Sequence, residues 1–136
     1  MEKDKKIPVN ITVTGKHEQD GLTDRTEDVY KGFLSKRGSS TYIVYEDTDN
    51  KLENRIKITS GRMEIKRPNS NLIYEKDETV SGFYGTPYGN IEIDTYTESF
   101  ETVETDDKFI CRLKGSINMN GSPVSRFTLE IEAAVS

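Results

Sequence analysis

Apolar residues occupy every second position in short runs along most of the chain. The first run spans residues 7–13, with Ile7, Val9, Ile11 and Val13 on one face, and residues 127–133 repeat the pattern near the other end. Because successive side chains of a strand point to opposite faces, a period of two predicts strands that are buried on one side. The first strand is therefore expected over residues 7–14.

Similar short runs recur about every ten residues and are separated by polar or glycine-containing turns. Further strands are expected within the following ranges: 26–36, 41–45, 56–58, 63–67, 72–74, 79–86, 91–98, 109–119 and 127–133. Turns are expected at 19–24, 37–40, 46–50, 86–89 and 120–122. No window has the apolar spacing of a helix, so crossover helices and a parallel sheet are excluded.

A chain of short antiparallel strands has to protect its sheet edges, either in a two-sheet sandwich or in a closed barrel. Glycines lie inside four of the strand patterns, at Gly15, Gly32, Gly82 and Gly115, where they permit the sharp bends of a small barrel. We therefore predict an all-β fold, an up-and-down antiparallel meander of about eight to nine strands closed into a barrel. Residues 1–136 form one domain, with residues 1–6 expected to be a flexible, charged N-terminus.

Composition and charge narrow the classes of partner. The 136 residues carry a net charge of −5, which gives no basic field for nucleic acid or for an anionic membrane surface. The sequence shows no apolar run long enough to span a bilayer and no secretory signal, so a cytoplasmic location is expected. Cys111 is the only cysteine and lies in a strand pattern, where we interpret it as a small core residue.

Residues 79–97 contain a Thr-Pro-Tyr-Gly turn at 86–89, which follows an aromatic strand and precedes an alternating strand that ends in Thr97. Upstream, residues 57–67 contain two short strand patterns that end in Arg67. This stretch resembles the central signature of the bacterial YwiB-like family of lipocalin-like proteins, and the order of elements is similar over residues 7–132. The resemblance implies a calycin-type barrel and no particular reaction.

The sequence offers little catalytic chemistry. His17 is the only histidine, so a metal cluster or a nucleophile–histidine pair would rest on this one residue. Glu92, Asp94 and Glu98 are interpreted as a solvated strand face, and the acidic residues of 46–50 as a polar turn without the calcium-loop pattern. We expect no catalytic residue, no metal and no cofactor, and an enzyme is the least supported of the functions considered.

A barrel of about eight strands has room either for packed side chains or for one small ligand. Hydroxyls and one cation are expected beside the apolar interior, and these groups are typical of a ligand site. The candidate ligand-binding residues are Arg67, Tyr84, Thr86, Tyr88, Thr95 and Thr97. The sequence thus favours a non-enzymatic binder of a small apolar or amphipathic ligand; a protein interaction module or homo-oligomer with a packed barrel is the alternative.

Overall fold

The computed structural model describes residues 6–47 and 51–136. The expected flexible N-terminus, apart from Lys6, and residues 48–50 of the expected turn at 46–50 lie outside the described residues. The described chain forms ten strands: β1 (Ile7–Gln19), β2 (Leu22–Arg37), β3 (Ser40–Glu46), β4 (Glu53–Thr59), β5 (Arg62–Arg67), β6 (Ser70–Glu75), β7 (Thr79–Thr86), β8 (Gly89–Glu104), β9 (Lys108–Met119) and β10 (Ser122–Val135).

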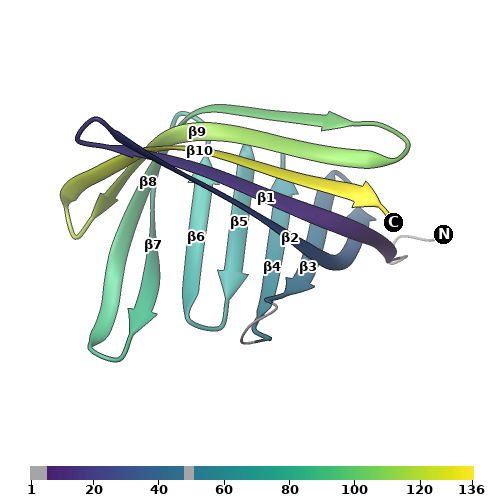
Figure 1. Ribbon diagram of the computed structural model, residues 1–136, viewed down its shortest axis with the longest axis horizontal. Helices are drawn as coiled ribbons and strands as arrows, with labels where there is room; N and C mark the ends of the chain where they lie inside the picture. The colour runs from purple at the N-terminus through teal and green to yellow at the C-terminus, as the bar shows by residue number, and fades with distance from the viewer. Residues whose placement is uncertain (1–5, 48–50) are drawn as a thin grey trace.

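The ten strands form a closed antiparallel barrel in which each strand pairs with the next and β1 pairs with β10. The long strands β1, β9 and β10 cross the short strands β3–β7 at a steep angle (Figure 1). The predicted all-β, up-and-down closed barrel is confirmed. The predicted number of about eight to nine strands was slightly low, because each of the ten expected ranges forms a strand of its own, including the short β4, β5 and β6 of six or seven residues.

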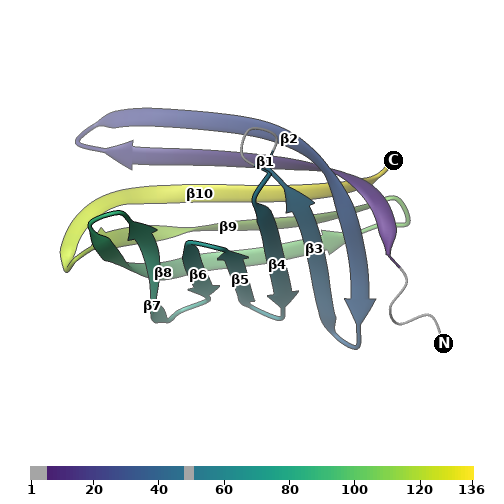
Figure 2. The same ribbon diagram turned by 90° about the horizontal axis from the view of Figure 1, so that it is seen from below.

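The β1–β2 hairpin is longer than its apolar pattern indicates. Instead of a turn over 19–24, only Asp20 and Gly21 form the turn, both with positive φ, and the ladder runs to the pair Gln19↔Leu22. Two residues with positive φ match the twist of the flanking strands. Among the described residues, β3 pairs with β2 only from Gly32 onward, so the first half of β2 forms an arm with β1 alone (Figure 2).

The barrel interior is packed over most of its length. The fully buried apolar side chains include Ile11, Ile43, Ile56, Met63, Cys111, Leu113 and Ile131. Tyr74 of β6 reaches Phe127 of β10, with the ring centroids 5.3 Å apart and the rings at 60°. An edge-to-face contact between these two strands, which are not neighbours in the sheet, shows that side chains fill the barrel at this level.

Two mid-strand glycines let neighbouring strands approach closely. A Cβ added to Gly115 would lie 1.8 Å from the carbonyl oxygen of Tyr96, and one added to Gly82 would lie 2.2 Å from that of Asn71. Gly115 also faces the β-bulge at which the β8–β9 register shifts between Thr97 and Ser99. The bends predicted from these glycines are therefore sites of backbone contact that a side chain would obstruct.

Candidate functional site

One end of the barrel, where β5 and β7 finish and β6 and β8 begin, carries polar side chains above an apolar wall. The register places Arg67, Ser70, Tyr84 and Ile91 in one row across β5–β8. Directly cross-strand residues share a face of the sheet, and this row lies on the same face as the buried Met63 and Tyr74. We call this end the mouth and define it by Asp47, Asn54, Ile65, Arg67, Ser70, Leu72, Tyr84 and Ile91.

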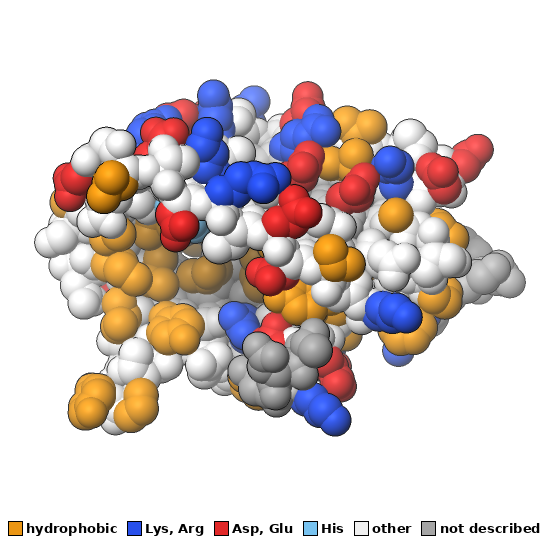
Figure 3. Space-filling model, in the orientation of Figure 1, with side chains coloured by type: hydrophobic (Ala, Val, Ile, Leu, Met, Phe, Trp, Pro, Cys, Tyr) orange, Lys and Arg blue, Asp and Glu red, His pale blue; other side chains and the backbone are white. Residues whose placement is uncertain are grey.

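The apolar wall of the mouth is incompletely covered. Ile65 and Leu72 face each other across β5 and β6 and point into the barrel, yet both are only half-buried, as is Ile91. One row deeper, Met63 and Tyr74 retain 0% and 6% of their exposure. The space-filling view shows a hollow on this face with hydrophobic side chains along its edge (Figure 3). The interior is thus filled below the mouth and accessible within it.

An ion pair and an amide form the polar part of the mouth. The Arg67 guanidinium donates to Asp47 Oδ2 over 2.5 Å, and the Asn54 amide donates to Asp47 Oδ1 over 3.1 Å. Asn54 also donates to the backbone carbonyl of Leu52. The buried Nε of Arg67 has no hydrogen-bond acceptor among the described residues. Most buried donors are paired, so this N–H is an unsatisfied donor beside Asp47.

Two tyrosines lie against this network. Tyr30 of β2 and Tyr45 of β3 stack with centroids 4.5 Å apart. The pKa of Tyr45 is raised to about 12, mainly by burial; Tyr30, Asp47 and Asp28 contribute in the same direction, and Arg67 opposes them. The acidic neighbours thus act on this hydroxyl in the same direction as desolvation.

The arm of β2 brings carboxylates towards the same end. In the β1–β2 ladder, Asp24 lies opposite His17 and Asp28 lies opposite Val13. Asp24 and Asp28 therefore lie on the inner face of the arm, the face that also carries Tyr30. His17 Nε2 lies 4.0 Å from the position of a Cβ on Gly15, so this histidine folds back along the inner face of β1.

The structure brings together only two of the six candidate residues named from the sequence. Arg67 and Tyr84 share the mouth row, about 10 Å apart at two strand spacings. The Thr86 hydroxyl is bonded to Gly89 and Tyr88 in the β7–β8 turn, where Tyr88 is 98% exposed.

The other two candidates lie deeper. Thr95 and Thr97 are fully buried. The Thr95 hydroxyl donates to the Ile73 carbonyl, whereas the Thr97 hydroxyl has no partner among the described residues. Neither side chain is on the surface of the mouth, so a ligand held there would not contact them.

The sequence reasoning missed Asp47, Asn54, Ile65 and Leu72. A signal was present for two of them, because Tyr45 and Asp47 continue the face of Ile43, and Asn54 continues the face of Ile56. Their juxtaposition with Arg67 depends on the register of β3, β4 and β5, which no local pattern contains.

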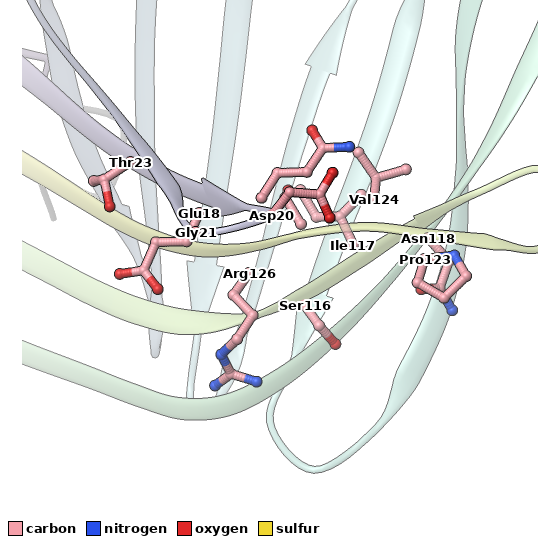
Figure 4. A pocket seen from close by; sticks show the side chains of 12 residues that line it. Glu18, Asp20, Gly21, Thr23, Ser116, Ile117, Asn118, Pro123, Val124 and Arg126 are labelled. Carbon is pink, nitrogen blue, oxygen red and sulfur yellow. The ribbon is translucent and has the colours of Figure 1, made fainter.

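A second hollow of about 620 Å³ lies between the tips of the β1–β2 and β9–β10 hairpins. Glu18, Asp20, Ile117, Pro123 and Arg126 contribute to its lining (Figure 4). Its arginine is already paired with Glu98 through two hydrogen bonds, of 2.5 and 2.8 Å. This exposed hollow, which we call the hairpin-tip groove, is therefore a weaker candidate site for a polar ligand than the mouth.

Over residues 6–47 and 51–136, no group of three histidine, cysteine or acidic side chains could hold a metal ion. The same part of the chain has no helix long and apolar enough to cross a membrane. What the mouth does offer is an apolar surface with a hydrogen-bond donor and acceptors at its edge.

The comparisons agree with this fold. Residues 11–131 match the model of the domain of unknown function DUF1934. The structure is similar to the crystal structure of the YwiB protein from Bacillus subtilis, with a TM-score of 0.83 and 18% identity over 96% of this chain and 93% of that chain. No curated protein matches the chain. The family resemblance expected from residues 57–67 and 79–97 is thereby confirmed, and the chain belongs to the DUF1934 family.

Proposed function

We propose that the protein is a non-enzymatic binder that holds a small amphipathic molecule in the mouth of its barrel. The apolar part of the ligand would lie on Ile65, Leu72 and Ile91, and its polar group would meet Arg67. The observation that carries the proposal is the half-buried, inward-facing set of apolar side chains beside a buried Arg67 Nε that lacks an acceptor among the described residues. Apolar surface with a few convergent polar groups is the usual composition of a small-molecule site.

The packed interior limits the ligand. Tyr74 and Phe127 fill the barrel beneath the mouth, so a long chain cannot thread through it. Each methylene removed from water contributes about 0.8 kcal/mol, and a chain of about ten carbons folded against the wall would supply most of the affinity. The expected ligand is therefore short or bent, with its polar group near the rim.

Binding of the neutral fluorophore 1-N-phenylnaphthylamine tests the proposal. Its emission should rise on addition of the protein, and 1-decanol should displace it. In Leu72→Trp the added ring occupies the mouth, and we expect at least a tenfold loss of affinity. Phe33→Trp is the matched control, because Phe33 is exposed on the outer face of β2. Unfolding midpoints of both variants establish that the barrel is intact.

Two results would count against a ligand in the mouth. One is the absence of any emission change with the unaltered protein. The other is equal binding by Leu72→Trp and Phe33→Trp, which would place the fluorophore on another surface.

A second candidate function is self-association or protein interaction through the arm of β2. Its supporting observation is that the described residues of 22–29 pair on one side only, with β1, and that Val29 is exposed beside them. Alternating charges at Asp24, Arg25 and Glu27 oppose such edge pairing. Sedimentation velocity separates the two: a dimer that Val29→Lys dissociates would favour this function, and a monomer at high concentration favours the first.

A further inference from the structure

The charges around the mouth are unevenly compensated. Arg67 and Asp47 neutralise each other, and the shallow outer groove beside Asp47 is lined by Glu46 and by two cations, Lys31 and Lys51. Asp24 and Asp28 remain on the inner face of the β2 arm. Neither forms an ion pair with a described residue; the described pairs of β2 involve Arg25 and Lys36 instead. Asp24 and Asp28 therefore leave uncompensated negative charge on the inner face of the arm, towards the mouth.

The Arg67 guanidinium nevertheless keeps one buried N–H group without an acceptor among the described residues. Its pairing with Asp47 occupies one terminal nitrogen, and the group without an acceptor is Nε. A buried donor without an acceptor is destabilising, because the hydrogen bond to water that it loses on folding is not replaced. An acceptor atom on the ligand would remove that cost without any need for a negative charge.

We infer that the mouth selects neutral amphiphiles whose polar group accepts a hydrogen bond, such as primary amides, alcohols or esters, over amphiphilic acids of the same length. This inference rests on the proposed ligand-binding function. Opposite charges a few ångströms apart near a protein surface attract each other, and like charges at the same distance repel by a similar amount. A ligand carboxylate beside Arg67 would gain this attraction and lose a similar amount to Asp47, and Asp28 would add further repulsion.

This selectivity can be measured by comparing the affinities for a neutral and a charged ligand in the unaltered protein and in a variant that lacks one charge. Decanamide and decanoate have the same chain length and differ in the charge of the head group at pH 8. Calorimetric titration of the unaltered protein should show decanamide binding at least tenfold more tightly than decanoate. In Asp47→Asn the amide keeps a hydrogen-bonding group beside Asn54 and frees the charge of Arg67, so the affinity for decanoate should rise at least tenfold relative to that for decanamide.

Two further variants complete the comparison. Asp28→Asn removes a charge from the exposed arm without touching Arg67, and decanoate should gain about threefold from the reduced repulsion. Asp106→Asn changes the net charge by the same unit at the exposed β8–β9 turn and should leave both affinities unchanged. Because Asp28 is exposed, its variant keeps the test informative if Asp47→Asn unfolds.

The outcomes separate this inference from the function on which it rests. Equal binding of decanoate and decanamide by the unaltered protein, or tighter binding of decylamine than of decanamide, would overturn the selectivity for neutral head groups and leave the binding function standing. An unchanged decanoate affinity in both Asp47→Asn and Asp28→Asn would also overturn it. If none of the three amphiphiles binds or displaces 1-N-phenylnaphthylamine, the proposed function fails, and the inference fails with it.

Discussion

Arg67 and Asp47 lie 20 residues apart in the chain and form an ion pair of 2.5 Å. The pair spans β4, because Asp47 directly follows β3 and Arg67 ends β5. Asn54 of β4 donates to the same carboxylate. The network thus ties the ends of three consecutive strands together at the mouth. It contributes to stability as well as to the proposed site, and the two roles can be measured separately.

Removal of Arg67 should destabilise the fold. In Arg67→Met the half-buried Asp47 loses its cation, and we expect the free energy of unfolding to fall by about 1–3 kcal/mol in urea titrations. Arg55→Met is the matched control, since the Arg55 side chain is 68% exposed in its pair with Glu53 and should cost less than about 0.5 kcal/mol. Equal losses in the two variants would show that the Arg67 pair has no special role.

The close approach of β8 and β9 predicts a strong difference between two glycines. Gly115→Ala would place a methyl group 1.8 Å from the Tyr96 carbonyl oxygen, a backbone atom that cannot rotate away. We expect a loss of roughly 3 kcal/mol, as in overpacked cores. Gly15→Ala meets two side-chain ends, the Thr26 hydroxyl at 3.2 Å and His17 Nε2 at 4.0 Å, and should change stability by less than about 1 kcal/mol. Similar denaturation midpoints for both variants would contradict the close strand packing.

Stability should fall at alkaline pH because of Tyr74. Burial raises the pKa of its hydroxyl from 10.0 to about 12, so the unfolded chain loses this proton first as the pH rises. The stabilisation is fully present below pH 10 and is lost as the pH increases towards 12, by roughly 2–3 kcal/mol. Urea titrations between pH 8 and 12 should show this decline, and Tyr74→Phe should make it shallower. The same slope in both proteins would argue against an ionisable hydroxyl in the core.

The thiol of Cys111 should be protected by the fold. Cys111 is fully buried, and burial raises its pKa to about 12, so little reactive thiolate is present at neutral pH. Labelling with 5,5′-dithiobis(2-nitrobenzoic acid) should be slow in native buffer and should accelerate with urea in parallel with unfolding. Rapid labelling without denaturant would show that the β9 face opens locally or is not packed.

The architecture could be predicted because it rests on local patterns. The period-two alternation of Ile7–Val13 and 127–133 identifies one-sided strands, and the turn residues Asn120 and Gly121 indicate the last hairpin, where both adopt positive φ. The end of the first hairpin could not be placed in this way. Polar residues such as Lys16 and Thr23 extend its ladder beyond the apolar core, and hydrophobic periodicity does not report such pairing.

The site could be predicted only in part. Arg67 and Tyr84 stand out as a cation and an aromatic residue near strand ends, but their common row requires the β5–β6–β7 register. The sequence pattern places Asp47 in a polar turn. It gives no sign of the ion pair with Arg67, because that pair joins the ends of two strands that are not neighbours. Thr95 and Thr97 are candidates in the sequence because their hydroxyls are small and polar. The sequence alone does not show that Tyr74 and Phe127 pack the barrel interior. Long-range register is the missing information in each case.

Chemical-shift mapping tests the central claim of a ligand in the mouth most directly. In ¹H–¹⁵N correlation spectra, titration with decanamide should shift the backbone amides of Ile65, Arg67, Leu72, Tyr84 and Ile91, and should leave those of Cys111 and Ile131 in the packed interior unchanged. Shifts confined to the hairpin-tip groove around Glu18 and Arg126, or no shifts at saturating decanamide, would contradict the account.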